Sequence, residues 1–191
     1  MDNRLRIIGG KWRGRKLEFP DVEGLRPTPD RVRETLFNWL QNDVQGARCL
    51  DLFAGSGALG LEALSRGAAY ALLVDDNAKV VSQLRQHLET LQTVDGKIHH
   101  GDALQILESP PNDNPFNIVF LDPPFGQGLI AACVKALESS GWLAENAKIY
   151  LETESGLQDL NLPDQWEILR LLKAGQVTCY LVARCPPATE S

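Results

Sequence analysis

The sequence predicts an α/β fold, in which a doubly wound and mostly parallel sheet has helices on both faces. First, short apolar segments alternate with segments of helical periodicity from about residue 47 onwards, as expected for right-handed crossovers between parallel strands. Second, 191 residues with 43% apolar content suffice for one well-filled core and not for two full domains. Third, an unusual residue follows each of the first four predicted strands, where ligands bind in this class of fold.

The segment ahead of the sheet is expected to form a small basic hairpin and one helix. Residues 4–19 have the pattern of two short strands, with Gly9-Gly10 as the turn between them. Thr28 is then expected to cap a helix that has Pro29 at its first position. The apolar stripe of this helix consists of Val32, Leu36, Phe37 and Leu40.

The sheet itself is predicted from five strands that are joined by helices. These strands are expected at residues 47–53, 70–75, 97–100, 117–122 and 148–154. One connecting helix stops at Gly67, the next is capped by Asn77, and a third spans residues 129–137. An antiparallel pair of strands, at residues 166–172 and 176–184, completes the predicted fold.

The charge of the chain is unevenly distributed. Residues 1–33 contain nine Lys or Arg and five Asp or Glu, whereas the remainder contains ten and twenty, within a net charge of −6. A basic N-terminal arm on an acidic body favours a polyanionic partner that is met by one end of the molecule. A solubilising surface is the alternative explanation.

The composition argues against a membrane protein or a secreted protein. No stretch approaches the roughly 18 consecutive apolar residues of a membrane span, and the charged N-terminus lacks the apolar core of a signal peptide. The four cysteines are scattered, without the close pairs of a zinc site, and are expected to be reduced thiols. We therefore expect a soluble, cytoplasmic protein without a bound metal.

The segment after the first predicted strand is a candidate cofactor loop and reads DLFAGSGALG at residues 51–60. Gly55, Gly57 and Gly60 satisfy the pattern G-x-G-x-x-G, which allows a sharp turn and the close approach of a ligand. The pattern by itself is compatible with a tight turn that binds nothing. It is compatible with a dinucleotide site as well, because Asp75 follows Gly55 by 20 residues, where a ribose-binding acid is expected.

Asp51 favours a different cofactor. A carboxylate four residues ahead of the first glycine would repel a pyrophosphate, whereas it suits the ammonium and sulfonium groups of S-adenosylmethionine. In this interpretation residues 51–57 hold the methionine part, Asp75 accepts hydrogen bonds from the ribose, and Asp102 lies beside the adenine. The candidate cofactor-binding residues are Asp51, Phe53, Gly55, Gly57, Asp75, Asp102 and Ala103.

The fourth predicted strand ends in Asp122, and Pro123, Pro124 and Phe125 follow at once as candidate catalytic residues. Because each proline fixes its φ and has no N–H, the pair gives the backbone a set direction. The Asp122 carboxylate and the Pro123 carbonyl then form two rigid acceptors, which match the two N–H groups of a nucleobase amine. Phe125 would stack on that base. The alternative is that the prolines merely end the strand and that Phe125 lies in the core.

Together these segments resemble the class I methyltransferases that modify amino groups of nucleobases. The resemblance is carried by DLFAGSGALG, by Asp75, by GDA at residues 101–103 and by DPPF at residues 122–125. More narrowly, the chain is similar to the RsmD-type 16S ribosomal RNA guanine-N2 methyltransferases in RIIGGKWRGRKL (residues 6–17) and RPTPDRVRETLFNWL (residues 26–40).

This resemblance implies a Rossmann-like, seven-stranded sheet whose last strand is antiparallel. It also implies an enzyme of EC class 2.1.1 that transfers one methyl group from S-adenosylmethionine to a guanine N2 in small-subunit ribosomal RNA, within the assembled 30S particle. An N6-adenine methyltransferase acting on DNA or RNA stays open, since the motif selects an amine and not a ring. An assembly factor without catalysis stays open too, as does an NAD-dependent oxidoreductase, although Asp51 argues against the last.

The N-terminal segments supply the candidates for RNA recognition. Arg31, Glu34 and Asn38 share a polar face of the predicted helix, which we expect to line the cofactor mouth and the path of the base; a solvated charged face is the alternative. The basic residues of the hairpin would contact phosphates, and Trp12 would stack on RNA. The candidate RNA-binding residues are Arg6, Lys11, Trp12, Arg13, Arg15, Lys16, Arg31 and Asn38.

The expected organisation is a single catalytic domain with an extension at each end. A basic, RNA-contacting arm is expected at residues 1–25, the methyltransferase domain at residues 26–185 and a disordered tail at residues 186–191. Because no helix has an obvious apolar surface, we expect a monomer.

Overall fold

A computed structural model describes residues 4–22, 28–111, 114–155 and 160–185 of the chain. The predicted tail at residues 186–191, and Arg26 and Pro27 of the sequence motif, lie outside the described residues. Within the described ranges no helix combines the length and the apolar character that crossing a membrane requires. In the same ranges no group of three or more His, Cys, Asp or Glu side chains could hold a metal ion. The four cysteines are free thiols, and three of them are buried.

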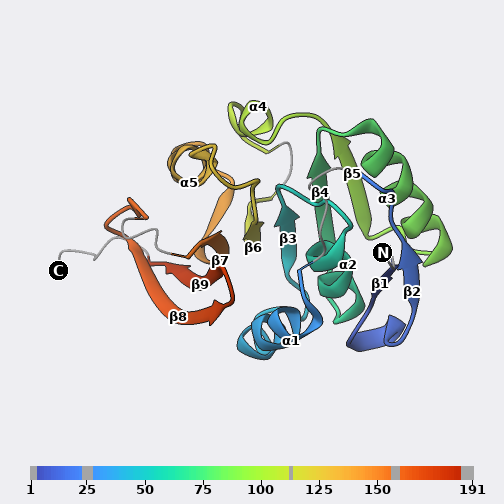
Figure 1. Cartoon of the computed structure of the whole chain (residues 1–191). Helices are drawn as coiled ribbons and strands as arrows, with labels where there is room; N and C mark the ends of the chain where they lie inside the picture. Colours follow the sequence, from blue (N-terminus) through green and yellow to red (C-terminus); the bar gives the residue numbers. More distant parts are fainter. Residues whose placement is uncertain (1–3, 23–27, 112–113, 156–159, 186–191) are drawn as a thin grey trace.

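Seven strands form one sheet in the order β5-β4-β3-β6-β7-β9-β8 (Figure 1). The strands are β3 (Arg48–Asp51), β4 (Tyr70–Asp75), β5 (Gly96–His100), β6 (Phe116–Leu121), β7 (Leu143–Glu154), β8 (Trp166–Ala174) and β9 (Val177–Arg184). Strands β3 to β7 run parallel, whereas β9 is antiparallel to both of its neighbours, β7 and β8. The predicted α/β fold, with its antiparallel last strand, is confirmed.

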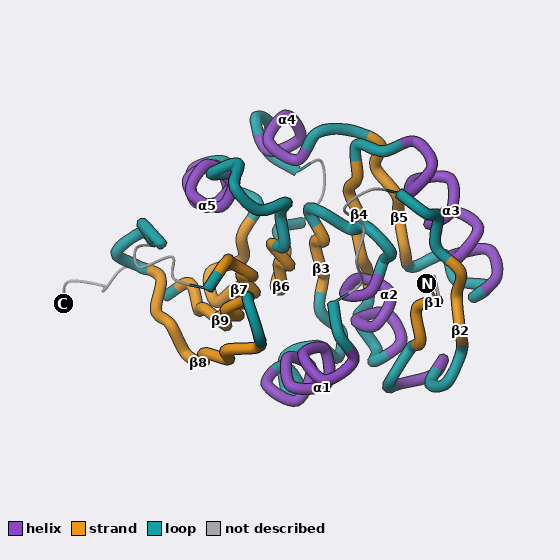
Figure 2. Tube along the Cα trace, in the orientation of Figure 1, coloured by secondary structure: helices purple, strands orange, loops and turns teal. Residues whose placement is uncertain are grey.

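Helices cover both faces of this sheet, as predicted, and a hydrophobic core lies beneath each layer of helices (Figures 1 and 2). The helices are α1 (Asp30–Trp39), α2 (Ala58–Ser65), α3 (Ala78–Thr90), α4 (Ala103–Leu107) and α5 (Leu129–Ser139). On one face α1, α2 and α3 contribute to a core that includes Phe37, Leu61 and Leu84. On the other face α4 and α5 contribute Leu107 and Leu137 to the second core.

For two helices, α3 and α1, the sequence predicted the residue that caps the amino end. Asn77 caps α3 as predicted, because its side chain accepts hydrogen bonds from two backbone N–H groups of the first turn. The predicted cap at Thr28 is wrong, since Pro29 occupies the cap position of α1 and no side chain caps that helix. The Thr28 carbonyl instead accepts a hydrogen bond from Arg33 Nε at 3.1 Å.

The strand order creates a switch point at the carboxyl ends of β3 and β6. From β3 the chain moves outward to β4 and β5, and it then returns to β6 on the other side of β3. The loops that leave β3 and β6 therefore diverge, and ligands bind between such loops in open α/β sheets. The sequence predicted the functional site at this edge of the sheet.

The N-terminal segment forms the predicted hairpin, but its paired glycines have another role. Its elements are β1 (Arg4–Arg6), the 3-10 helix η1 (Gly10–Trp12) and β2 (Lys16–Glu18). The two strands pair antiparallel. A Cβ atom on Gly10, whose φ is +71°, would lie 1.8 Å from the backbone oxygen of Ser65 at the end of α2. Gly9-Gly10 is thus a close contact with α2 and not the turn that the sequence predicted.

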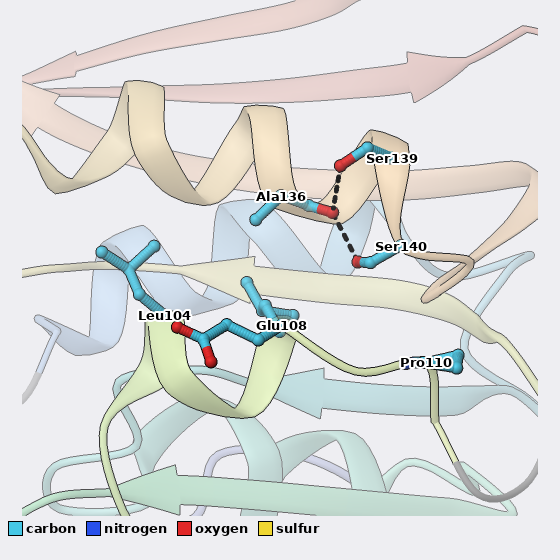
Figure 3. A pocket seen from close by; sticks show the side chains of 7 residues that line it. Leu104, Glu108, Pro110, Ala136, Ser139 and Ser140 are labelled. Carbon is cyan, nitrogen blue, oxygen red and sulfur yellow. Dashed lines mark hydrogen bonds between the residues drawn. The ribbon is translucent and has the colours of Figure 1, made fainter.

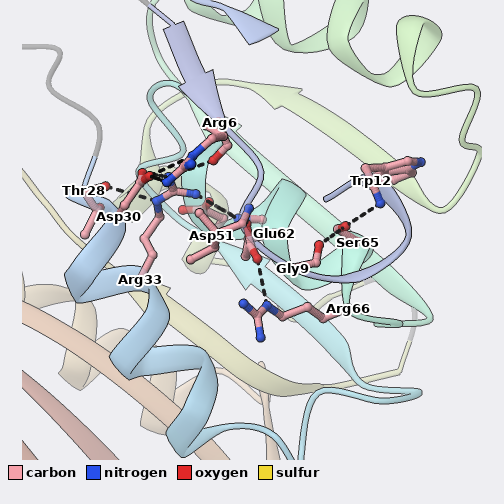
Figure 4. Close-up of polar contacts among 12 residues, drawn as sticks. Arg6, Gly9, Trp12, Thr28, Asp30, Arg33, Asp51, Glu62, Ser65 and Arg66 are labelled. Carbon is pink, nitrogen blue, oxygen red and sulfur yellow. Dashed lines mark hydrogen bonds and ion pairs between the residues drawn. The ribbon is translucent and has the colours of Figure 1, made fainter. Parts of the chain in front are cut away.

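A buried ion-pair network holds the hairpin and α1 against α2 (Figure 4). The buried Glu62 carboxylate accepts a hydrogen bond from the Ile8 N–H at 2.9 Å and pairs with Arg66 at 2.8 Å. Its Oε2 atom also lies 3.4 Å from Nη1 of Arg33, which is only 1% exposed. Arg33 in turn donates to the Arg6 carbonyl at 2.9 Å. The network therefore links three segments that are distant in the sequence through the buried charges of Glu62 and Arg33 and the partly exposed Arg66.

Candidate active site

Four aspartates lie at the carboxyl ends of the parallel strands β3 to β6. Asp51 and Asp75 are the last residues of β3 and β4, Asp102 follows β5 as the cap of α4, and Asp122 comes directly after β6. Because β3 lies between β4 and β6, Asp51 is flanked by the ends of both neighbouring strands. The four acids that the sequence singled out therefore share one edge of the sheet.

The glycine loop after β3 is held in place by two of these acids. The Gly60 N–H donates to Oδ2 of Asp51 at 2.9 Å, and the Gly55 N–H donates to Oδ2 of Asp75 at 2.9 Å. Gly57 has a φ of +80°, and a Cβ there would lie 2.8 Å from side-chain atoms of both α2 and α3. The carboxylates that are candidates for cofactor binding thus also shape the loop.

The Asp51 carboxyl is buried beside this loop, and burial raises its pKa from 3.8 to about 7. The Gly60 N–H acts in the opposite direction, the negative charge of Asp75 raises the pKa further, and the Phe53 N–H lowers it. Burial also raises the pKa of Asp75. Such carboxyl groups ionise more readily beside a cation, so the site fits the ammonium and sulfonium groups of S-adenosylmethionine.

Replacing Asp51 with Asn is expected to stabilise the ligand-free protein, by about 2–3 kcal/mol more at pH 8 than at pH 5. The pKa of Asp51 is about 7 in the folded protein and 3.8 as its ordinary value. The folded state therefore binds the extra proton between these values, and stability falls as the pH rises through this window. Thermal unfolding at the two pH values measures the effect. The exposed Asp43→Asn variant is the control, and an equal effect of Asp51→Asn at both pH values would contradict the prediction.

The other candidate cofactor residues lie near the starts of the loop and of α4. Asp102 is exposed, and its Oδ1 accepts a hydrogen bond from the Gln105 N–H at 2.8 Å. Ala103 is buried as the first residue of α4, and Phe53 packs partly buried against the core beneath α4 and α5. Their contacts with a cofactor stay predictions.

The Asp-Pro-Pro-Phe corner after β6 borders a cavity of about 250 Å³, which is lined by Pro123, Pro124, Phe125 and parts of α5 and β7. Pro123 is buried and Pro124 is exposed, while the Phe125 ring is 46% exposed. The alternative that Phe125 belongs to the core is therefore wrong. An exposed aromatic ring close to a strand-end carboxylate is suited to stacking on a base.

Glu152 was not predicted from the sequence, yet it lies beside Asp122. Strands β6 and β7 pair with Leu121 opposite Leu151, so Asp122 and Glu152 are the next residues in line. The Glu152 side chain is buried, and its Oε2 accepts a hydrogen bond from the Tyr150 hydroxyl at 2.8 Å. The available signal was a glutamate that directly follows the apolar residues 149–151 of a predicted buried strand, because Glu is rarely buried without a partner.

Asp122, Glu152 and Asp51 form a cluster of buried or half-buried carboxyl groups. Burial raises the pKa of Asp122 well above its usual range, and the charges of Glu152 and Asp51 raise it further. Burial likewise raises the pKa of Glu152, against the effect of the Tyr150 hydroxyl. In the part of the chain that the structure describes, none of the three forms an ion pair with Lys or Arg. A bound cation would relieve their mutual repulsion.

The hairpin contains most of the candidate RNA-binding residues, and one of them is corrected. Trp12 is 8% exposed and lies in the core between the hairpin and α2, so its ring is not available for stacking on RNA. The Nζ atom of Lys11 lies 4.5 Å from that ring and 3.8 Å from Asp95. Arg15 donates to the Thr90 carbonyl at 3.1 Å. Both contacts lie near the amino end of β5, at the opposite edge of the sheet from the aspartates.

The remaining RNA candidates are exposed to solvent. Arg6 forms an ion pair with Asp30, at 2.6 Å between Nη2 and Oδ2. Burial by itself would raise the pKa of Asp30, but the hydrogen bonds and charges of Arg6 and Arg33 outweigh it and lower the pKa. The other exposed candidates are Arg13, Lys16, Arg31 and Asn38, and Glu34 on the polar face of α1 is exposed as well. Their exposure permits contact with RNA, which stays a prediction.

A second cavity, of about 510 Å³, lies between α4 and α5 and is separate from this site (Figure 3). Its lining includes Glu108 and Pro110 after α4, and Ser139 and Ser140 at the end of α5. Both serine hydroxyls donate to the Ala136 carbonyl, at 3.3 Å and 2.5 Å. These donors are therefore already used within α5, and no predicted site residue lines the cavity.

The chain is similar along nearly its whole length to one family of proteins. The family model described as Conserved hypothetical protein 95 matches residues 5–183. The Escherichia coli (strain K12) protein named Ribosomal RNA small subunit methyltransferase D is 50% identical over 183 residues, which cover 95% of this chain and 90% of the relative. The Haemophilus influenzae protein of the same name is 44% identical over 176 residues, or 91% of each chain. The solved structure of Escherichia coli yhhF has a TM-score of 0.88 at 47% identity, covering 95% of this chain and 98% of that one.

Proposed function

The chain belongs to the Conserved hypothetical protein 95 family, as a relative of ribosomal RNA small subunit methyltransferase D, and we propose that it methylates the N2 amine of a guanine in small-subunit ribosomal RNA. It is an S-adenosylmethionine-dependent methyltransferase of EC class 2.1.1, and not the NAD-dependent oxidoreductase that the glycine pattern left open. One observation carries the proposal of an amine substrate. A carboxylate and two prolines form the corner after β6, one strand away from Asp51 and the glycine loop.

The proposed role of the corner is to hold the amine in a reactive geometry. The Asp122 carboxylate and the Pro123 carbonyl accept its two N–H groups, while Phe125 stacks on the base. The lone pair of such an amine is conjugated with the ring. Holding both hydrogens out of the ring plane turns the nitrogen toward tetrahedral geometry and frees the lone pair for attack.

The proposed cofactor residues bind and orient the methyl donor. S-adenosylmethionine supplies a methyl group on a positively charged sulfur. Asp51 and the loop with Gly55 and Gly57 would hold its methionine part, Asp75 its ribose hydroxyls and Asp102 its adenine. The buried carboxyl cluster supports this assignment, because it lacks a cation among the described residues.

The proposed substrate is RNA within the assembled 30S particle. Residues 1–25 would act as an RNA-contacting extension of the methyltransferase domain at residues 26–185, in a cytoplasmic monomer. RNA shape or ribosomal proteins would select the guanine. The exposed polar face of α1, formed by Arg31, Glu34 and Asn38, would border the path of the base.

A methyl-transfer assay tests the proposed function. The purified protein is given S-adenosylmethionine with a labelled methyl group and three substrates: undermodified small-subunit particles, naked 16S RNA and duplex DNA. Mass spectrometry of the product nucleosides is expected to find N2-methylguanosine in the particles. N6-methyladenosine would favour the adenine alternative, and the absence of any labelled RNA nucleoside would overturn the proposal.

Removal of two hairpin charges is expected to weaken RNA binding and its salt dependence together. In the Arg13→Ala/Lys16→Ala variant, the slope of log affinity against log salt concentration should fall by about 2, since each phosphate contact contributes about 1. Fluorescence anisotropy between about 50 and 200 mM salt measures this slope. The matched control is Arg170→Ala/Lys173→Ala, which removes two exposed charges from the edge strand β8. Equal slopes for the two double variants would exclude the hairpin from the RNA interface.

A further inference from the structure

Glu152 and Asp122 occupy equivalent positions on neighbouring parallel strands. Phe120 pairs with Tyr150 and Leu121 with Leu151, so Asp122 and Glu152 are the next opposed pair at the carboxyl edge. Because side chains alternate along a strand, Glu152 emerges on the same face of the sheet as Tyr150. This register places the two residues side by side, and the charge of Glu152 is the largest influence on the pKa of Asp122 after burial.

Among the residues that the structure describes, the groups around Glu152 are hydrogen-bond donors and carboxyl groups, and none of them is a basic side chain. Its own strand contributes Tyr150, whose hydroxyl lies 2.8 Å from Oε2. From β9 it faces Cys179, whose Sγ lies 3.2 Å from the same hydroxyl. The ends of β6 and β3 contribute Asp122 and Asp51. Since the Glu152 side chain is only 7% exposed, water screens these charges poorly.

We propose that Glu152 and Asp122 share a single proton in the ligand-free protein, that this proton leaves to solvent when the cationic methyl donor binds, and that the ionised pair then takes up the proton which the substrate amine loses on methylation. Two buried carboxyl groups at opposed positions of neighbouring strands do not both ionise freely, so without a cation nearby one proton stays on the pair. Glu152 is a positioning residue in this scheme, because it acts through Asp122. The transfer of a proton from the substrate amine rests on the proposed function. The proton that Glu152 and Asp122 share in the ligand-free protein does not depend on that function.

The proton balance of the step is simple. The amine nitrogen forms a bond to the methyl carbon as the carbon–sulfur bond breaks, and that electron pair stays on sulfur. The nitrogen, now positively charged, gives one proton to the Asp122 carboxylate. Glu152 raises the proton affinity of Asp122 through its charge, and it shares the proton after transfer. No oxidant or further reactant is required.

The Glu152→Gln variant tests the pair, since glutamine keeps the size of the side chain and its hydrogen bond with Tyr150. Without the neighbouring charge the pKa of Asp122 is lower. The rise of kcat with pH is therefore expected to occur about one pH unit lower than in the wild type. The plateau kcat is expected to fall about 10- to 100-fold, with the KM for RNA nearly unchanged. Glu152→Asp keeps the charge, so its kcat should rise at the same pH as that of the wild type. Glu167→Gln, an exposed substitution on β8, is the control.

A merely structural role for Glu152 predicts a different result. The activity of Glu152→Gln would then fall equally at every pH. A folded Glu152→Gln variant whose kcat rises at the same pH as that of the wild type would overturn the inference. Absence of guanine methylation by the wild-type protein would instead overturn the proposed function and leave the proton pair standing.

Infrared spectroscopy of the ligand-free protein tests the shared proton without any activity, and it serves even where Glu152→Gln does not fold. The Asp51→Asn protein, which lacks the other carboxyl group with a pKa of about 7, is expected to show the carbonyl band of a protonated carboxyl group at pH 7. That band should be lost in Asp51→Asn/Asp122→Asn, because Asp122 is a member of the pair. A band that survives in this double variant, or that is absent from Asp51→Asn, would overturn the pair.

Discussion

Replacing Asp122 with Ala is expected to lower kcat for RNA methylation by about 10³-fold, while the affinity for S-adenosylmethionine stays close to that of the wild type. The variant removes the carboxylate that holds the amine, but it leaves Asp51, Asp75 and the glycine loop intact. Steady-state kinetics on small-subunit particles measures the first quantity, and calorimetry measures the second. A loss of activity with cofactor binding retained would separate amine positioning from cofactor binding.

Two controls separate this effect from a loss of structure. Asp43→Ala removes an exposed carboxylate far from the strand ends and should keep full activity. The unfolding temperature of Asp122→Ala at pH 8 should not fall, because burial and, after it, like charges raise the pKa of this carboxyl, and its ionisation therefore opposes folding. A kcat within tenfold of the wild type would contradict the assignment of Asp122.

Replacing Glu62 with Ala is expected to lower the free energy of unfolding by about 3–5 kcal/mol. The substitution leaves the Arg33 guanidinium, 1% exposed, without its buried carboxylate partner. It also removes the acceptor of the Ile8 N–H and the partner of Arg66. Arg33 keeps its ion pair with Asp30, whose side chain is 45% exposed, so the expected cost comes from removing the buried carboxylate that the Ile8 N–H, Arg33 and Arg66 all face. Urea unfolding followed by circular dichroism measures it.

Replacing both members of the buried pair should cost less than replacing one. The Arg33→Met/Glu62→Leu double variant is expected to be more stable than Glu62→Ala, since it leaves neither of the two charges in the interior. Glu89→Ala, an exposed position on α3, should stay within about 0.5 kcal/mol of the wild type. If Glu62→Ala costs less than about 1 kcal/mol, the network does not hold the hairpin as described.

The sequence by itself determined the fold class and the edge of the sheet that carries the site. Strand and helix periods are local properties, so the alternation of elements predicted a parallel sheet with helices on both faces. The same pattern located four strands, although the first was predicted to continue to residue 53 and β3 ends at Asp51, and parallel strands end at a common edge. Asp51, Asp75, Asp102 and Asp122 could therefore be grouped before any coordinates were known.

Tertiary structure alone decided which polar and aromatic residues are buried. Trp12 lies inside the molecule because Gly10 lets the hairpin approach α2 closely, and Arg33 is buried because Glu62 lies opposite it. Glu152 joins the site because β7 pairs with β6 in one particular register. Each of these placements depends on a partner distant in the sequence. Local periodicity carries no information about such partners, since burial of a charge is set by the groups that surround it in space.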